Sequence, residues 1–257
     1  MTSRNVLVED KEGGVYIVRM NRPEKRNALD AHQWELITET ISALAEKADI
    51  RCLVLTGAGS VFAAGGDISQ FLKEVSSLEG AKQFRARIHK CFTSFYNFPR
   101  PTIAMINGPA IGGGMELALA CDVRVASDGA TVCMPAVKFG MVMAYHDFRR
   151  LAATVGPDRA RFLTMTGRVI GAEEAYRIGF VHEVVNQNEL EDVTMKMAAN
   201  LTEVDVQSAL WFRKATEYVI EGNSVGLSEL REFEECCLSS EDFRARVELF
   251  LGRRGEK

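Results

Sequence analysis

The sequence predicts a mixed α/β core followed by an all-α region. One unit occurs twice, over residues 52–68 and 102–117: an apolar strand enters a glycine-rich loop, which leads into a helix with an acidic residue near its start. Beyond about residue 195 the apolar residues keep only helical spacing. We therefore expect residues 1–195 to form the core that holds the functional site. Residues 196–257 should form a separate helical region.

Strands and helices alternate in the first part of the chain. Short apolar runs predict strands, and apolar residues at helical spacing predict helices. Asp30 precedes the first helix in the position of an N-cap, and the prolines at 99 and 101 stop the second helix. The expected strands cover residues 5–10, 15–20, 51–57 and 102–107, and the expected helices cover 29–47 and 78–98.

The second half adds a few strands and then becomes mainly helical. After residue 145 the pattern is mostly that of amphipathic helices, and no low-complexity linker separates the halves. The expected strands cover residues 122–127, 130–135 and 179–185, and four helices are expected within 195–200, 205–220, 226–237 and 241–254.

The composition excludes several classes of function. Of the 257 residues 47% are hydrophobic, which is enough for a large core. A net charge of −4 provides no basic surface for nucleic acid or for an anionic membrane. The sequence shows no apolar signal region and no run of about 18 apolar residues. We expect a soluble, cytoplasmic protein.

The cysteine and histidine patterns point away from disulfides and metals. The six cysteines form no Cys-x-x-Cys pair and most lie in apolar runs, so we expect buried, reduced thiols. The four histidines form neither His-x-x-x-His nor His-Glu-x-x-His. No metal site is therefore expected.

The second glycine loop carries the clearest sign of function. Three glycines, Gly112 to Gly114, run into a helix whose first turn carries Glu116. A phosphate-binding loop would end in Gly-Lys-Ser or Gly-Lys-Thr, and a dinucleotide fingerprint would follow the first strand of a βαβ unit. A hydrolase nucleophile elbow would place Ser or Cys between glycines. None of these patterns is present in this loop.

An oxyanion hole is the interpretation that remains. Glycine lets a backbone N–H approach a ligand oxygen closely, because no Cβ stands in the way. One such N–H from each glycine loop could hold a carbonyl oxygen that becomes an enolate, and Glu116 would handle a proton at a neighbouring carbon. A structural interpretation stays open: the glycines allow tight helix–strand packing, and Glu116 caps a helix.

Four separated segments, residues 21–30, 53–68, 106–127 and 166–185, resemble the enoyl-CoA hydratase/isomerase (crotonase) family in order and spacing. The resemblance implies a spiral of β-β-α units with a C-terminal helical region that drives trimerisation, often to a dimer of trimers. It also implies an acyl-CoA or enoyl-CoA thioester as substrate. Coenzyme A would be part of that substrate, and no separate cofactor is expected.

The family's functional residues carry over to named positions of this chain. The resemblance implies that the oxyanion N–H groups belong to Gly66 and Gly113, and that Glu116 is the first catalytic glutamate. The cations Lys25 and Arg26 suit the phosphates of coenzyme A. The alternative is that they are only a solvated pair of charges. The residues expected to bind the CoA substrate are Lys25, Arg26, Ala28, Ala64, Gly66, Asp67, Ile68 and Gly113.

The chain departs from the family at the second glutamate. That position holds Ala136, so one acid/base is missing and efficient hydration is in doubt. Met143, Tyr145, His146 and Asp147 stand where the family usually has Pro, Ala, Gly and Gly, which indicates a reshaped acyl pocket. His146 and Asp147 are candidate replacement acid/bases. An altered helix N-terminus with Asp147 as its cap is the alternative.

Two classes of function follow. The first is an acyl-CoA enzyme, foremost a hydratase-like lyase, with an isomerase, a hydrolase or a decarboxylase as alternatives that use the same enolate chemistry. The second is a catalytically weak protein that binds acyl-CoA. Retention of Gly66, Gly113 and Glu116 favours the enzyme.

Overall fold

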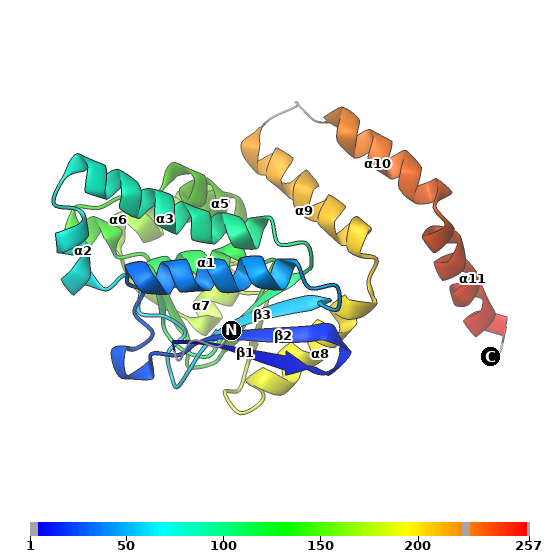
Figure 1. Cartoon of the computed structure of the whole chain (residues 1–257), viewed down its shortest axis with the longest axis horizontal. Coiled ribbons are helices and arrows are strands. Elements are labelled where there is room, and N and C mark those ends of the chain that lie inside the picture. Colours follow the sequence, from blue (N-terminus) through cyan, green and yellow to red (C-terminus); the bar gives the residue numbers. More distant parts are fainter. Residues whose placement is uncertain (1–4, 223–226, 256–257) are drawn as a thin grey trace. The chain divides into compact units, whose positions relative to one another are not determined.

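The computed structural model describes residues 5–222 and 227–255, and Figure 1 shows the helices and strands. The first of its two compact units contains a six-stranded sheet and a small three-stranded sheet. The strand order in the large sheet is β1-β2-β3-β4-β6-β9; β1 and β2 are antiparallel and the others run parallel. Its strands are β1 Val6–Lys11, β2 Val15–Met20, β3 Cys52–Gly57, β4 Thr102–Ile106, β6 Val123–Ser127 and β9 Glu183–Val185, and the small sheet contains β5 Ala110–Ile111, β7 Thr131–Cys133 and β8 Val169–Gly171.

Helices cover both faces of the large sheet (Figure 1). Alternate side chains of β2 enter two separate apolar clusters: Tyr16 and Val18 pack with residues of α1 and α3, and Ile17 packs with residues of α8. Because both faces are covered, β3 and β4 are buried along their whole length. The helices are α1 Ala31–Ala45, α2 Ile68–Glu74, α3 Leu78–Tyr96, α4 Gly113–Ala120, α5 Tyr145–Val155, α6 Pro157–Thr166, α7 Ala172–Arg177 and α8 Leu190–Glu203.

Helix α1 forms where the sequence predicts it. The Asp30 side chain accepts a hydrogen bond from the Gln33 N–H at 2.8 Å, which satisfies a donor at the start of the helix. Trp34, Ile37 and Ile41 then recur at helical spacing and are completely or almost completely buried. The capping and the periodicity together account for the helix.

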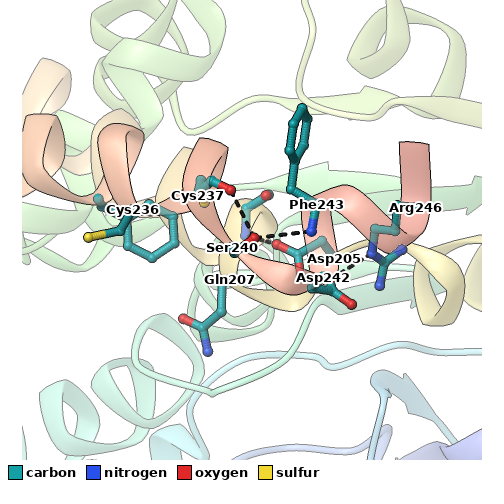
Figure 2. A pocket seen from close by; sticks show the side chains of 10 residues that line it. Asp205, Gln207, Cys236, Cys237, Ser240, Asp242, Phe243 and Arg246 are labelled. Atoms are coloured by element: carbon teal, nitrogen blue, oxygen red, sulfur yellow. Dashed lines mark hydrogen bonds and ion pairs between the residues drawn. The ribbon is translucent and has the colours of Figure 1, made fainter. Parts of the chain in front are cut away.

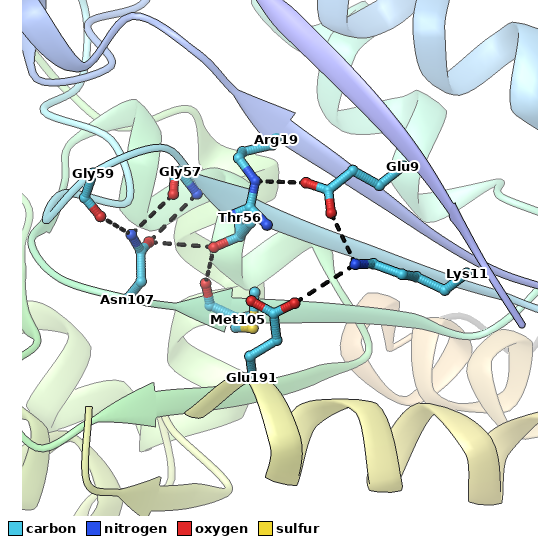
Figure 3. Close-up of polar contacts among 9 residues, drawn as sticks. All are labelled: Glu9, Lys11, Arg19, Thr56, Gly57, Gly59, Met105, Asn107 and Glu191. Carbon is cyan, nitrogen blue, oxygen red and sulfur yellow. Dashed lines mark hydrogen bonds and ion pairs between the residues drawn. The ribbon is translucent and has the colours of Figure 1, made fainter. Parts of the chain in front are cut away.

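Buried amides fix the loop that follows β3. Figure 3 shows Asn107, just beyond β4, donating to the carbonyls of Gly57 (2.9 Å) and Gly59 (2.8 Å). The Thr56 hydroxyl donates to the Met105 carbonyl at 2.8 Å in the same view. From the other side, Asn27 donates to the Val61 carbonyl at 2.7 Å. These bonds satisfy buried carbonyls that no strand partner reaches, and they set the path of the first glycine loop.

An ion-pair chain runs along the same sheet, from Arg19 beside Thr56 to Lys11. In Figure 3 the Lys11 ammonium lies 3.1 Å from Glu9 and 3.7 Å from Glu191, while Arg19 donates to Glu9 at 2.8 Å. The chain links β1 and β2 to α8 at the surface. Each such pair contributes about 1 kcal/mol at most, so packing dominates this junction.

The second compact unit begins at Asp205. It contains α9 Val206–Glu221, α10 Leu227–Ser239 and α11 Glu241–Gly255. The Asp205 side chain accepts from the Ser208 N–H (2.7 Å), and the Trp211 indole donates to the Leu230 carbonyl (3.1 Å). The cap starts α9, and the indole bond ties α9 to α10.

The boundary between the two compact units falls later than the sequence analysis expects, although the last strand ends at Val185. The division lies after Val204, whereas the expected boundary at residue 195 falls inside α8. Leu190 and Ala198 of α8 are buried in the cluster beneath the large sheet. The segment 195–200 therefore belongs to the first unit, because its apolar face packs on the sheet. The oligomerisation role of the helical region stays a prediction.

The thiols differ between the two units. Cys52, Cys91, Cys121 and Cys133 are buried and belong to no disulfide among the described residues, as predicted. Cys236 is exposed and Cys237 half-buried in α10, so the prediction of burial is wrong at Cys236. Within the described ranges, no helix is long and apolar enough to cross a membrane.

Candidate functional site

The two glycine-rich loops lie side by side. Because β3 and β4 are neighbouring parallel strands, the chain leaves both of them at the same edge of the sheet. The Ala63 N–H donates to the Pro109 carbonyl (3.1 Å), and the Ala63 carbonyl accepts the Ile111 N–H (2.9 Å). The unit that occurs twice in the sequence thus places both loops in one site.

Close packing explains two of the glycines in the second loop. A Cβ on Gly114 would stand 2.5 Å from the Ala63 carbonyl oxygen, and one on Gly113 would stand 2.9 Å from the Trp34 ring. Helix α4 therefore packs more closely than a side chain at these positions permits. This confirms the packing half of the structural interpretation. Its other half is wrong, because the N-cap of α4 is Gly112, and Glu116 lies within the first turn.

Gly66 has no such packing role. A Cβ on Gly66 would meet no described atom within 4 Å, so this residue borders open space. The Leu29 N–H donates to the Gly65 carbonyl (2.8 Å), and the Asp67 N–H donates to the Leu29 carbonyl (3.1 Å). The Gly65 carbonyl and the Gly66 N–H belong to one trans peptide unit and point in opposite directions. The Gly66 N–H is therefore directed away from Leu29.

The same geometry frees the N–H of Gly113. The Gly112 carbonyl accepts the Glu116 N–H at 3.0 Å, so this carbonyl points along α4. The Gly113 N–H shares a peptide unit with that carbonyl and must point out of the helix start. It is one of the N–H groups that a helix leaves without an internal partner, at the end where the helix dipole favours negative charge.

Glu116 is an acid whose proton is held near neutral pH. Its side chain is half-buried, and loss of hydration is the largest cause that raises its pKa, to about 8. The negative charge of Asp147 raises this pKa further, whereas the charge of Arg85 lowers it. Burial therefore outweighs the helix N-terminus, which favours the ionised form. A carboxyl of this kind can both give and take a proton near neutral pH.

Asp147 lies on α5, which packs against α4, and is only 3% exposed. The Tyr96 hydroxyl donates to Asp147 Oδ1 at 3.1 Å, and the Nδ1 atom of His146 is 3.6 Å from the same oxygen. The expectation that Asp147 caps α5 is wrong, because the N-cap is Ala144 and makes no side-chain cap bond. Of the two candidate acid/bases, Asp147 is thus the one whose charge reaches Glu116.

The residues expected to bind coenzyme A gather around the start of α2. The Ala28 N–H donates to the Lys25 carbonyl (3.0 Å), and the Ala64 N–H donates to the Arg26 carbonyl (3.0 Å). The Lys25 ammonium is 3.9 Å from Asp67, which caps α2 by accepting from the Ser69 N–H (3.2 Å). The Ile68 side chain after it is 52% exposed. The structure brings these residues together; their binding role stays a prediction.

The model of the enoyl-CoA hydratase/isomerase family matches residues 10–248 of this chain. The chain belongs to this family. It is 34% identical to the short-chain-enoyl-CoA hydratase of Clostridium acetobutylicum and 32% identical to the crotonyl-CoA hydratase of Syntrophomonas wolfei; each match covers 99% of this chain and 97% of the relative. The enoyl-CoA hydratase of Bacillus anthracis has a solved structure similar to this one, with a TM-score of 0.88, 27% identity, and coverage of 97% of this chain and 96% of that chain. These matches confirm the crotonase-type α/β fold and a hydratase-like enzyme.

In this member of the enoyl-CoA hydratase/isomerase family, Ala136 lies close to the second glycine loop. The Gly112 N–H donates to the Cys133 carbonyl (2.8 Å), and a Cβ on Gly112 would be 3.9 Å from Pro135. Ala136 follows directly, begins the short 3₁₀ helix Ala136–Phe139 and is 9% exposed. The position is thus part of the site's wall, but it offers no carboxylate.

Three supporting residues escaped the sequence analysis of this hydratase-like chain. Tyr96 ends α3 and meets Asp147 across 51 positions of sequence, a pairing that no local pattern signals. Arg22 is buried and donates to Asp30 (2.6 Å) and to the Ala28 carbonyl (3.0 Å), which fixes the loop before α1. Asn27 stands in a run of polar loop residues, so the sequence gives no sign that its side chain is buried. In that run, Asn27 and Arg26 adopt left-handed backbone angles.

A separate cavity of about 290 Å³ lies within the second unit (Figure 2). Figure 2 shows Ser240 bonded to Cys237 and Phe243, and Asp242 paired with Arg246 across one helical turn. None of the residues expected at the active site lines this cavity. Among the residues that the structure describes, no group of three or more His, Cys, Asp and Glu side chains could hold a metal ion.

Proposed function

We propose that this chain binds an enoyl-CoA thioester and adds water across its double bond. The curated relatives named as hydratases support this reaction. The observation that carries the proposal is local: the Gly113 N–H points out of the start of α4, and the proton-holding carboxyl of Glu116 follows within the same turn. A thioester oxygen bound at that N–H would place the acyl carbons near the acid.

The oxyanion hole would consist of the N–H groups of Gly66 and Gly113. Each N–H points opposite to the preceding carbonyl, which accepts a backbone hydrogen bond, and Gly66 borders open space. Negative charge develops on the thioester oxygen as the enolate forms, and two preorganised donors stabilise this charge. Loss of one such donor typically costs about 3–4 kcal/mol of transition-state stabilisation.

The proton balance of hydration fits a protonated Glu116. The oxygen of water bonds to the β carbon, and the π electrons of the double bond move to the thioester oxygen as an enolate. The α carbon then takes the proton of Glu116 as the enolate collapses. The second proton of the attacking water returns to the Glu116 carboxylate, so the net change is the addition of one water.

Coenzyme A would enter over the start of α2. The cations of Lys25 and Arg26 suit its phosphates, while Ala28, Ala64, Asp67 and Ile68 form the surrounding surface. No separate cofactor takes part in this scheme, because the thioester itself supplies the electron sink. We further propose that the chain works as a homotrimer or as a dimer of trimers.

An isomerase is the second candidate, because Ala136 leaves Glu116 without a carboxylate at the family's second position. A single carboxyl can remove an α proton from a 3-enoyl-CoA and return it at the γ carbon, with no water consumed. Loss of carbon dioxide from a malonyl-type thioester would form the same enolate, whereas attack of water on the thioester carbon would place a tetrahedral oxyanion in the same oxyanion hole before the CoA thiolate leaves. A protein that only binds acyl-CoA would perform none of these steps.

A panel of thioesters separates these functions. We would supply crotonyl-CoA, a 3-enoyl-CoA, a saturated acyl-CoA and a malonyl-type CoA, and would follow enoyl absorbance, free thiol and carbon dioxide. Hydration of crotonyl-CoA that exceeds every other reaction supports the proposal. Faster movement of the 3-enoyl double bond identifies an isomerase. Tight CoA-ester binding with no product from any member of the panel contradicts the enzymatic proposal.

A further inference from the structure

Two helices of the first unit share a partly buried polar contact, and the charge in it acts on Glu116 of a third helix. Tyr96 comes from the last turn of α3, Glu116 from α4 and Asp147 from α5. The Tyr96 hydroxyl donates to Asp147 Oδ1 at 3.1 Å. The Arg150 guanidinium lies over the Tyr96 ring, 3.5 Å from its centroid, and holds that ring in place.

We propose that the Tyr96–Asp147 pair is the positioning element that keeps the proton of the active site on Glu116 at neutral pH. The inference rests on the proposed acid/base role of Glu116 and deepens it. Asp147 is 3% exposed, so it acts through Glu116 and does not reach the substrate. Neither Tyr96 nor Arg150 has a role in the hydration scheme itself.

Glu116 and Asp147 are two carboxyls whose hydration is reduced by burial and whose charges interact. Two neighbouring carboxylates repel each other, so such a pair tends to retain one proton between them. The group that accepts a hydroxyl hydrogen bond is the one stabilised as the anion. Tyr96 donates to Asp147, and the proton therefore stays on Glu116. The hydroxyl of Tyr96 selects which of the two acids is neutral.

The electrostatics of the three groups agree with this geometry. Burial is the largest cause, and the Asp147 charge the second, of the rise in the pKa of Glu116 to about 8. Burial, together with Asp147, also raises the pKa of Tyr96 far above its usual range. Tyr96 therefore remains a hydroxyl donor at every pH at which the protein would work.

The other charged groups around Glu116 act weakly or in the opposite direction. On α3, Arg85 lowers the pKa of Glu116, and it is exposed, so solvent and salt screen it. The rings of His89 and His146 pack edge-on with centroids 6.0 Å apart, and His146 faces Asp147. Two strands, β4 and β5, pack on α4, and neither of them contains a titratable residue.

His146 also faces Asp147. Its buried Nδ1 has no hydrogen-bond partner among the described residues, and it stands 3.6 Å from Asp147 Oδ1. The Tyr96 hydroxyl, at 3.1 Å, is therefore the closer hydrogen-bonding group to Asp147 Oδ1.

A direct titration of Glu116 tests the pair. The protein is labelled with ¹³C at the glutamate carboxyls, and the Glu116 signal is identified by its loss in Glu116→Gln. Asp147→Asn should lower the midpoint of this signal by about one pH unit, because it removes a neighbouring like charge. Tyr96→Phe should lower the midpoint by less. Arg85→Gln should raise it, and added salt should shrink that rise.

Matched changes at exposed positions control for the chemistry of each substitution. Asp158→Asn and Tyr176→Phe alter residues on α6 and α7, and both should leave the midpoint unchanged. An unchanged midpoint in Asp147→Asn overturns the inference. If Asp147→Asn does not fold, Tyr96→Phe decides the question by itself, and a midpoint equal to that of the wild type overturns the inference.

The titration needs no substrate, so its failure is distinct from failure of the proposed function. Midpoints that shift as predicted support the pair even if no thioester is turned over. Turnover of crotonyl-CoA with midpoints that do not respond to Asp147 contradicts the pair and leaves the hydratase standing. In an active enzyme, the basic limb of the pH–rate profile should move with the midpoint in Asp147→Asn and Tyr96→Phe, a shift that mere loss of stability does not produce.

Discussion

Glu116 combines a helix start, a neighbouring charge and burial in one residue. The helix dipole favours its anion, whereas burial and the charge of Asp147 favour the neutral acid, and the balance lies with the acid. Such a residue lowers the free energy of unfolding as the pH rises above its unfolded-state pKa, because the folded protein must then keep a proton that the unfolded chain has released.

The first prediction is a pH-dependent gain of stability in Glu116→Gln. The pKa of Glu116 is raised from 4.5 to about 8 in the folded protein, so between these values the folded state binds more protons than the unfolded state. Stability from this group is therefore lost as the pH rises from about 4.5 to about 8. The variant lacks this loss, and its Tm relative to wild type should increase with pH over that window. Glu173→Gln, on the exposed side of α7, is the control, and equal pH dependence in wild type and Glu116→Gln would refute the argument.

The second prediction concerns the missing carboxylate. Ala136→Glu should raise the rate of crotonyl-CoA hydration, because position 136 adjoins the second glycine loop and alanine leaves space for an acid. General acid–base assistance is typically worth about 10²–10⁴-fold, and an imperfectly placed carboxylate should recover only part of it. The rate is measured by loss of enoyl-thioester absorbance. Fast hydration by the wild type, with no gain in the variant, would show that Ala136 is no obstacle.

At the scale of elements, the periodicity of the sequence predicts much of the framework. The strand–loop–helix unit was visible twice, and the structure places both copies on the neighbouring parallel strands β3 and β4. The cap at Asp30 and the start of α2 at Asp67 also follow from local patterns. These features are local, and local residue preferences therefore suffice to predict them.

The remaining features depend on contacts between distant segments. Tyr96 and Asp147 meet only because α3 and α5 both pack against α4, which no sequence spacing reveals. The boundary of the first unit depends on α8 packing beneath the sheet, and its residues look like those of any amphipathic helix. The sequence predicts a helix cap at Asp147 from its position near the start of a helix, because the sequence does not show that Tyr96 is its partner.

The third prediction separates the two glycine loops. A Cβ at Gly66 meets no described atom within 4 Å, whereas a Cβ at Gly113 lies 2.9 Å from Trp34. Gly66→Ala should therefore keep the stability of the wild type while its methyl group obstructs the thioester and lowers kcat/KM by about 10²-fold. Gly113→Ala should lower the free energy of unfolding by about 1–3 kcal/mol, since Trp34 is fully buried. Thermal unfolding and steady-state kinetics check both; a Gly66→Ala protein with full activity would refute the assignment of Gly66.

At the scale of the whole molecule, apolar surface is the feature left to explain. In the helical unit Phe212 is 66% exposed, Val219 82% and Leu238 66%, and exposed apolar side chains of this size favour association. The first unit also exposes Phe162 and Met165 on α6.

The fourth prediction is therefore a homotrimer or a hexamer in solution. Burial of these apolar faces between copies would remove them from water, which favours assembly by about 25 cal/mol per Å² of apolar area. Analytical ultracentrifugation at micromolar concentration gives the mass directly. A monomer under these conditions would contradict the prediction, and charged substitutions at Phe212 and Val219 should dissociate a genuine assembly.

The central claim is that Glu116 performs the proton transfer beside an oxyanion hole in an enoyl-CoA hydratase-like site. Glu116→Gln keeps the shape of the side chain but cannot exchange a proton, so crotonyl-CoA hydration should fall by about 10²–10⁴-fold, the usual worth of general acid–base catalysis. Binding of a saturated acyl-CoA, measured by calorimetry, should stay near the wild-type value, because the oxyanion donors and the CoA surface are unchanged. A matched Glu173→Gln protein should retain full activity. Hydration by Glu116→Gln at the wild-type rate would contradict the account.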